Sequence, residues 1–173
     1  DGSVSRLGAA SGFLSGYDFV GAVVGSEGTL GVVTEITVRL TEIPEATETA
    51  LVIFNDVPSA CRLVGRVIRS GMVPAALEVV DQRTIEAVEA SVYAAGLPLD
   101  AGAVLIVEFD GVRCELPAQL SRLREMAEQE GAREVSVARS PEERAHFWRA
   151  RKGAFGAMGR LAPDLYVHDA VVP

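Results

Sequence analysis

A glycine-rich stretch, "GSEGTLG" at residues 25–31, has the composition of a ligand-binding loop. Its glycines, Gly25, Gly28 and Gly31, stand at every third position, and a β-branched run follows directly. Glycine permits positive φ and lets backbone N–H groups approach a ligand closely. A P-loop is excluded because the lysine is missing, and a Rossmann turn because the glycine spacing differs and no helix is expected to follow. The stretch predicts either a backbone cradle for a phosphate- or ribose-bearing cofactor or a tight turn between strands.

Arg151 is the second candidate, because it lies in a helical segment rich in aromatic residues. When residues 144–161 are projected at about 100° per residue, Arg151 falls near the centre of an apolar face. That face consists of Phe147, Trp148, Ala154, Phe155 and Met158. A buried guanidinium is costly unless it meets an anion, and its planar fork suits a carboxylate. The pattern predicts either a carboxylate-binding residue or an ion pair with a structural carboxylate such as Glu78 or Glu108.

The remaining reactive side chains point to no further site. His168 could act as an acid or base, but a partly buried, hydrogen-bonded histidine is the preferred interpretation. Cys61 is expected in the core, and His146 on the surface. Two cysteines far apart and two histidines favour neither a disulfide framework nor a metal centre, so no metal site is expected.

The elements that carry these residues fall into two regions. Strands are expected at residues 1–8 and 32–40, where apolar side chains alternate in the second stretch. Residues 19–24 predict a short strand or a helical turn. Residues 41–48 are polar, contain a proline and predict a linker.

From residue 49 the pattern alternates between strands and helices. Strands are expected at 49–54, 74–80, 102–109, 133–138 and 165–172. Helices are expected at 56–71, 81–96, 116–130 and 140–160. Asp81 and Ser140 are predicted N-caps, the latter with Glu143 in the capping-box position. Single helices between strands predict an α/β or α+β layer with helices covering one face of a sheet.

The composition limits the class of protein. Hydrophobic residues make up 49% of the chain and charged residues 23%, which is typical of a globular protein with a core. A net charge of −8 argues against nucleic acid as a partner. No apolar run reaches the roughly 18 residues that a transmembrane helix needs. We expect a cytoplasmic protein.

Residues 16–40, "GYDFVGAVVGSEGTLGVVTEITVRL", strongly resemble the FAD-linked oxidases with a PCMH-type, vanillyl-alcohol-oxidase-like FAD-binding domain. Residues 77–89, 96–111 and 148–173 are similar to the glycolate oxidase branch of this family. D-lactate and D-2-hydroxyglutarate dehydrogenases share the architecture. The resemblance implies FAD as cofactor and oxidation of glycolate or a related D-2-hydroxy acid to the 2-oxo acid. D-lactate oxidation, or a non-catalytic subunit with an incomplete FAD site, remains the alternative.

The resemblance also implies a fold. It is α+β: the C-terminal end of a PCMH-type FAD-binding domain at residues 1–46, then part of a substrate domain at 47–173. The substrate domain is expected to be a ferredoxin-like antiparallel sheet with helices on one face. The rest of the FAD-binding domain is expected before Asp1, and a histidine-rich substrate-site segment after Pro173. The chain is therefore interpreted as a fragment of a longer protein. The resemblance also implies partner subunits of a glycolate oxidase complex, through which the protein would associate with a membrane.

The family's site residues carry over by position. The FAD-contacting residues implied are Gly25, Ser26, Glu27, Gly28, Thr29, Gly31, Val32, Val33 and Thr34. The second arginine of "WRAR", Arg151, matches a W-x-x-R pattern in which this arginine binds the substrate carboxylate. No catalytic residue is expected within the chain, because the histidines that line the substrate site are expected downstream.

Overall fold

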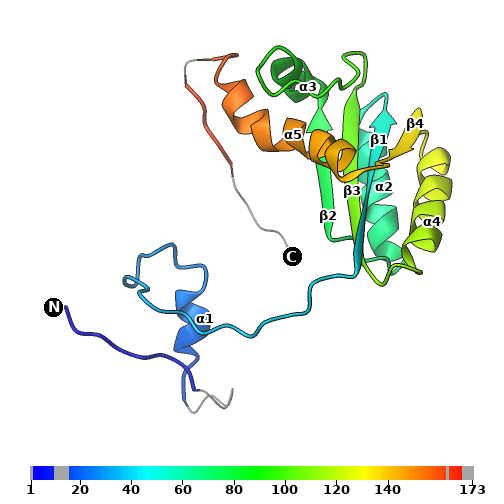
Figure 1. Cartoon of the computed structure of the whole chain (residues 1–173). Coiled ribbons are helices and arrows are strands. Elements are labelled where there is room, and N and C mark those ends of the chain that lie inside the picture. The colour runs from blue at the N-terminus through cyan, green and yellow to red at the C-terminus, as the bar shows by residue number, and fades with distance from the viewer. Residues whose placement is uncertain (1, 10–15, 163, 169–173) are drawn as a thin grey trace. The chain divides into compact units, whose positions relative to one another are not determined.

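The computed structural model describes residues 2–9, 16–162 and 164–168 (Figure 1). Internal contacts divide the chain into two units, residues 1–42 and 43–173. This division falls close to the domain boundary predicted between residues 46 and 47. The domain boundary itself stays a prediction. β1 already begins at Ala46, so the predicted linker at 41–48 is shorter than its composition indicated.

The first unit contains one short helix among its described residues, α1 (Phe19–Val23). Asp18 caps α1 by accepting a hydrogen bond from the Gly21 N–H at 2.8 Å, so the helical alternative for this stretch is correct. The strands predicted at 1–8 and 32–40 are wrong, because residues 2–8 and 32–40 belong to no strand. A strand needs a neighbour for its backbone groups, and no described strand pairs with either stretch.

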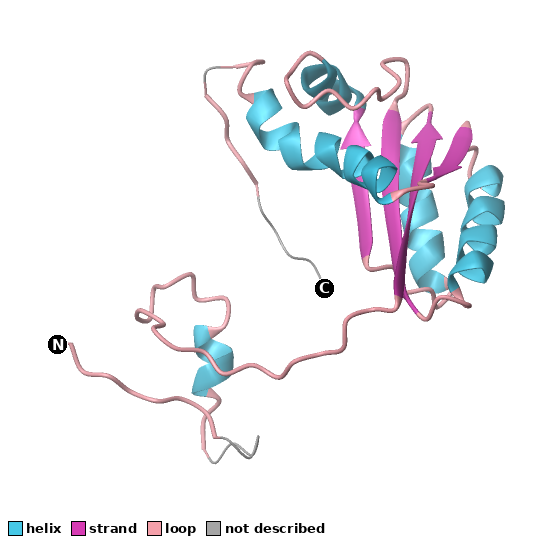
Figure 2. Cartoon of the chain, viewed as in Figure 1, coloured by secondary structure: helices cyan, strands magenta, loops and turns pink. Residues whose placement is uncertain are grey.

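The second unit is built on a four-stranded antiparallel sheet in the order β2-β3-β1-β4 (Figure 2). Its strands are β1 (Ala46–Phe54), β2 (Ala76–Asp81), β3 (Ala103–Gly111) and β4 (Glu134–Val137). The central strands β1 and β3 pair along their whole length, from Ala46 opposite Gly111 to Phe54 opposite Ala103. A helix follows each of β1 and β3, and this order is ferredoxin-like. The prediction of a ferredoxin-like antiparallel sheet in an α+β fold is confirmed.

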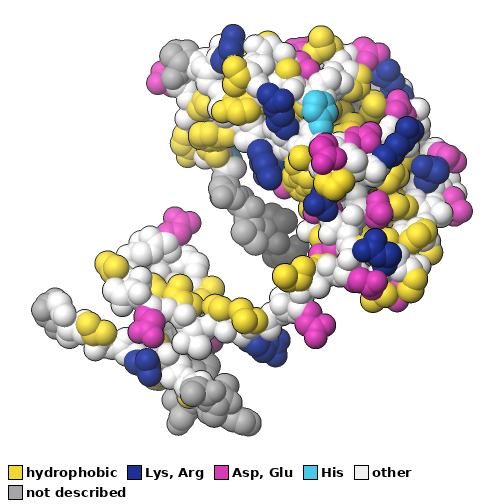
Figure 3. Space-filling model, viewed as in Figure 1, with side chains coloured by type: hydrophobic (Ala, Val, Ile, Leu, Met, Phe, Trp, Pro, Cys, Tyr) yellow, Lys and Arg dark blue, Asp and Glu magenta, His cyan; other side chains and the backbone are white. Residues whose placement is uncertain are grey.

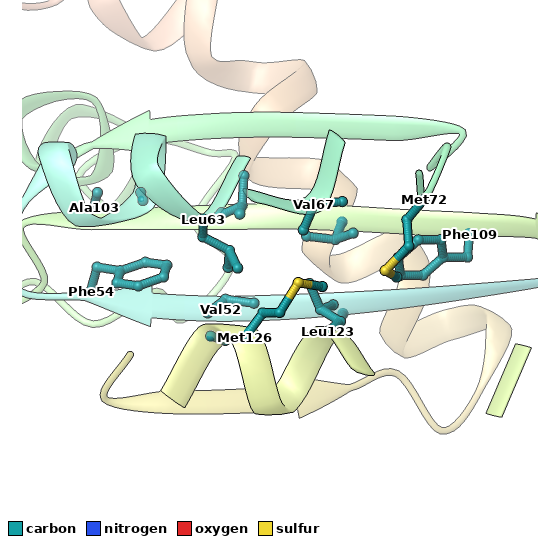
Figure 4. Close-up of a cluster of buried hydrophobic side chains, with 14 of the residues drawn as sticks. Val52, Phe54, Leu63, Val67, Met72, Ala103, Phe109, Leu123 and Met126 are labelled. Atoms are coloured by element: carbon teal, nitrogen blue, oxygen red, sulfur yellow. The ribbon is translucent and has the colours of Figure 1, made fainter. Parts of the chain in front are cut away.

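One face of the sheet is covered by α2 (Val57–Arg69) and α4 (Leu116–Gln129). Leu63 and Val67 of α2, and Leu123 of α4, are fully buried against β1 and β3 (Figure 4). α2 starts where its sequence indicates, because the Asp56 carboxylate accepts a hydrogen bond from the Ser59 N–H at 2.7 Å. The apolar side chains between the sheet and the pair α2 and α4 form the larger of the two cores.

The opposite face is covered by α3 (Gln82–Glu89) and α5 (Pro141–Met158). Ile85 of α3 and Ala150 of α5 are fully buried there, against Val104 and Ile106 of β3. The prediction that helices cover only one face is therefore wrong. The central strands β1 and β3 show the reason, because their consecutive residues are apolar rather than alternating. Such strands are buried on both faces, so helices must cover both faces of the sheet.

Two predicted elements end early or are missing. The helix predicted at 81–96 ends at Glu89, and its carboxylate then accepts hydrogen bonds from the N–H groups of Ala95, Gly96 and Leu97. These bonds fold the chain back on itself, which a helical periodicity cannot reveal. The strand predicted at 165–172 is wrong for residues 165–168, which pair with no strand, and its other residues lie outside those described.

Candidate functional site

The glycine loop consists of two successive turns after α1. The Ser26 N–H donates to Val23 O at 3.0 Å, and the Thr29 N–H donates to Ser26 O at 3.0 Å. The Thr29 hydroxyl donates to the same Ser26 carbonyl at 2.7 Å. Gly25 and Gly28 adopt φ values of 82° and 78°. The spacing of the glycines therefore has a local cause, because each turn ends in a backbone conformation that other residues rarely adopt.

These turns leave backbone donors available. Among the described residues, no partner is recorded for the N–H groups of Gly25, Glu27, Gly28, Leu30 and Gly31. A Cβ added at Gly25 or Gly28 would have no heavy atom within 4 Å, so the loop is open on that side. Glu27 also has a positive φ, 50°. Clustered N–H donors in an open glycine loop can bind a phosphate, so the residues present fit one part of an FAD site.

The strand-like segment after the loop is exposed in this unit. Val32 is 90% exposed and Val33 54% exposed, and Thr34 is exposed as well. The hydrophobic side chains of this segment are visible on the surface in Figure 3. Their role as FAD contacts stays a prediction.

Arg151 lies on α5 but not in its buried stripe. The residues of α5 that face the core are Phe147, Ala150, Gly153 and Ala157. Phe155, predicted on the apolar face, is 68% exposed, so the predicted centre of that face was wrong by about a quarter turn. Aromatic residues define the face expected from sequence, whereas at Gly153 the close approach of Tyr93, in the segment after α3, leaves no room for a side chain. Arg151 therefore stands at the margin of the core.

An ion pair holds Arg151 to the sheet. Its Nε–H donates to the Glu78 carboxylate of β2 at 2.7 Å, with 47% of the arginine side chain and 33% of the glutamate side chain exposed. The hydrogen bond that Arg151 donates to this carboxylate, and then the carboxylate's charge, raise the pKa of Arg151 above its ordinary value. The structural ion pair anticipated with Glu78 is thus present. Within the described residues, the two terminal nitrogens, Nη1 and Nη2, have no recorded partner.

A second carboxylate, Glu108 of β3, was not assigned a role from sequence beyond a candidate partner of Arg151. It accepts hydrogen bonds from the Thr49 hydroxyl at 2.6 Å and from the Trp148 indole N–H at 2.8 Å. Thr49 lies directly opposite Glu108 in the β1–β3 register and is fully buried. In the sequence, the signal for this pair was the occurrence of two polar residues, Thr49 and Glu108, within otherwise apolar strands. Through Trp148 this network fixes the helix that carries Arg151.

Other candidates are placed differently from expectation. Cys61 is exposed, because the buried side of α2 passes through Ala60 and Leu63 instead. His168 is exposed and lies edge-on to the Tyr166 ring at 4.6 Å, so the expectation of a partly buried histidine was wrong. His146 is exposed, as expected. No helix in the described part of the chain has the length and apolar character needed to cross a membrane.

The candidate residues are divided between the two units of the chain. The loop belongs to the first unit and Arg151 to the second. Arg151, Glu78, Glu108 and Trp148 do gather on one face of the sheet, at α5. The chain thus carries two separate candidate elements, a backbone loop for an anion and an arginine for a carboxylate.

Comparison with protein families gives a match over residues 43–173 to the "FAD linked oxidases, C-terminal domain". Solved structures of alkyldihydroxyacetonephosphate synthase share the fold, with a TM-score of 0.60 and 18% identity. That alignment covers 83% of this chain and 30% of the other.

Curated relatives match along the chain as well. The glycolate oxidase subunit GlcD of Escherichia coli K12 is 38% identical over 173 residues, which is 100% of this chain and 34% of that protein. The GlcD of Bacillus subtilis is 37% identical over 92% of this chain and 34% of its own length. The mitochondrial D-lactate dehydrogenase [cytochrome] of Arabidopsis thaliana is 32% identical, covering 92% of this chain and 28% of its own length. The chain spans about a third of the GlcD length.

Proposed function

Because this chain belongs to the FAD-linked oxidases, with residues 43–173 matching the family's C-terminal domain, we propose that the full-length protein oxidises glycolate or a related D-2-hydroxy acid to the 2-oxo acid. The observation that carries the proposal is the 38% identity to glycolate oxidase subunits along the whole chain. FAD is the cofactor that family membership indicates. Partner subunits of a glycolate oxidase complex, and membrane association through them, are part of the same proposal.

Each part of the chain has a defined task in this proposal. When bound, FAD would accept the hydride from the α-carbon of the substrate. The loop residues Gly25–Gly31 would hold the cofactor through backbone N–H groups, with Val32, Val33 and Thr34 beside it. Arg151 would hold the substrate carboxylate with its terminal nitrogens. The base that takes the hydroxyl proton would come from outside this chain.

A test of the whole proposal uses the full-length protein. A flavin absorbance spectrum and turnover with glycolate are expected, with a lower kcat/KM for D-lactate. A clear preference for D-lactate would favour the second candidate, which the Arabidopsis relative supports. A colourless protein that stays without flavin after incubation with FAD would contradict both and favour a non-catalytic subunit.

The role of Arg151 is tested by Arg151→Ala in the full-length protein. Loss of a charge-assisted contact of about 1.5–3 kcal/mol corresponds to a fall in kcat/KM of about 10- to 100-fold. Lys152→Ala is the matched control, because it removes the adjacent exposed cation from the same helix. Equal effects of the two substitutions would show that Arg151 contributes only general charge.

The role of the loop is tested by Gly28→Ala. The substitution strains a residue at φ 78°, and we expect it to lower the flavin content of the full-length protein. Gly71→Ala is the control, since Gly71 has φ 82° and open space around it but lies at the end of α2. Flavin content that falls equally in both variants would mean that general destabilisation, not the loop, is responsible.

A further inference from the structure

We propose that Glu78 is a positioning residue, which orients the Arg151 guanidinium so that its two terminal nitrogens face the substrate carboxylate. The inference rests on the proposed function, because it gives Arg151 the carboxylate of a 2-hydroxy acid as ligand. It adds a residue and a geometric reason to that site.

The first step is the geometry of the contact. A guanidinium has five N–H donors in a flat fork, and a carboxylate can meet it from the side, at Nε, or from the end, at Nη1 and Nη2. Glu78 meets the side, through Nε at 2.7 Å. No described residue takes Nη1 or Nη2. The end of the fork is thus left for a second carboxylate in bidentate geometry.

The second step is the rigidity of both partners. Glu78 lies in β2 with Ile106 of β3 as its register partner, inside a paired sheet. Arg151 lies on α5, which is fixed by the fully buried Ala150 and by the Trp148 indole bond to Glu108. With its helix anchored and its Nε bound, the flexible arginine loses rotational freedom before any ligand arrives. Preorganisation of this kind lowers the entropic cost of binding.

The third step is that stability alone does not explain the pair. An ion pair with both partners a third to a half exposed contributes little to the folding free energy. The other ion pairs of the described residues do not involve Arg151 or Glu78. In one of them, the Arg133 Nη2 lies 2.8 Å from the Asp100 carboxylate. That pair therefore serves as a matched control of similar length without a candidate site.

The experiment is a double-mutant cycle in the full-length protein, with Glu78→Ala, Arg151→Ala and both together. The readouts are kcat and KM for glycolate and the inhibition constant of acetate, a carboxylate that cannot be oxidised in this way. We expect Glu78→Ala to raise the KM and the acetate constant about five- to tenfold, equivalent to about 1 kcal/mol, with kcat within about twofold. In the Arg151→Ala background the same substitution should have no further effect.

Two further variants separate loss of positioning from poor folding and from the loss of an ion pair in general. Glu78→Gln retains an oxygen that accepts from Nε, so it should restore most of the acetate affinity even if the alanine variant folds poorly. Asp100→Ala should leave both constants unchanged. Thermal unfolding and flavin content of every variant report folding separately.

The outcomes separate this inference from the function on which it rests. If Arg151→Ala weakens acetate binding but neither Glu78 variant does, positioning by Glu78 is refuted and the proposed function stands. A lower KM in Glu78→Ala would show that Glu78 competes with the substrate, and would also overturn the inference. If Arg151→Ala changes nothing in an active flavoenzyme, the assigned role of Arg151 fails, and positioning fails with it.

Discussion

Gly153 permits a close contact between α5 and the segment that follows α3. A Cβ built at Gly153 would overlap Tyr93 Cβ and Cγ, which are near the backbone and cannot swing away. We expect Gly153→Ala to destabilise the chain by about 1–3 kcal/mol, the usual cost of overpacking, measured as a lower midpoint of thermal unfolding.

Gly156→Ala is the natural control for this prediction. Its Cβ would lie 3.5 Å from Tyr93 Cε2, which is an ordinary contact. Alanine is also the better helix former by about 1 kcal/mol, so this variant should match or exceed the parent in stability. An equal loss of stability in both variants would show that the overlap with Tyr93 is not the cause of the loss.

Glu108 gives a second prediction at the scale of single residues. Glu108→Ala would leave the buried Thr49 hydroxyl and the Trp148 indole N–H without their acceptor. An unsatisfied buried donor costs about 1–3 kcal/mol, so denaturant unfolding should show a clear loss. Glu108→Gln keeps one acceptor oxygen and should lose less. A Gln variant as unstable as the Ala variant would mean that the charge, rather than the hydrogen bonds, matters.

Among the elements, α2 shows how a cap makes stability depend on pH. The Ser59 backbone N–H, and then its hydroxyl, hold the pKa of the Asp56 carboxyl below its ordinary value of 3.8. A carboxyl with a lowered folded-state pKa stabilises the fold above the unfolded-state pKa. That contribution is lost as pH falls through the folded-state value. The midpoint temperature of thermal unfolding should therefore fall below about pH 4, partly because this carboxyl group becomes protonated.

Asp56→Asn isolates this contribution, because asparagine caps a helix without a titrating charge. The parent should exceed the variant in unfolding midpoint near neutral pH, and the difference should shrink as the pH falls below about 4. A difference that stays constant over that range would contradict the assignment of the cap to an ionised carboxylate.

The elements also show what the sequence could reveal. The helices beginning after Asp56, Asp81 and Ser140 were predictable, because each cap is a local contact between residues three apart. The second helical layer, α3 and α5, was not predictable, because it depends on which strands lie at the centre of the sheet, and local sequence patterns do not reveal the strand order. The end of α3 at Glu89 was missed because its carboxylate binds N–H groups six to eight residues away.

The candidate site followed the same rule. The positive φ of Gly25 and Gly28 is local and was visible in the spacing. The contact between Arg151 and Glu78 joins residues 73 positions apart in the chain, and sequence could name Glu78 only as one of two partners. Strand register then decided between them, since Glu108 is occupied by Thr49 and Trp148.

At the scale of the whole molecule, the first unit exposes an apolar face that a solitary protein would avoid. By the alternation in the sequence, Val32, Ile36 and Val38 would share one side of the segment if it were extended, and they are 90%, 73% and 68% exposed. No described strand pairs with this segment, so its backbone groups are available as well. Apolar surface and an unpaired backbone together favour association with another strand.

We therefore expect these 173 residues, purified alone, to associate through the segment at residues 32–40. Light scattering across a concentration series should show oligomers, because intermolecular strand pairing buries the exposed side chains. Ile36→Lys should shift the population towards monomer, since a charge on the apolar face opposes its burial. Thr37→Lys adds the same charge to the other side of the segment and should act more weakly. A chain that stays monomeric at every concentration, or equal effects of the two lysines, would refute association through this face.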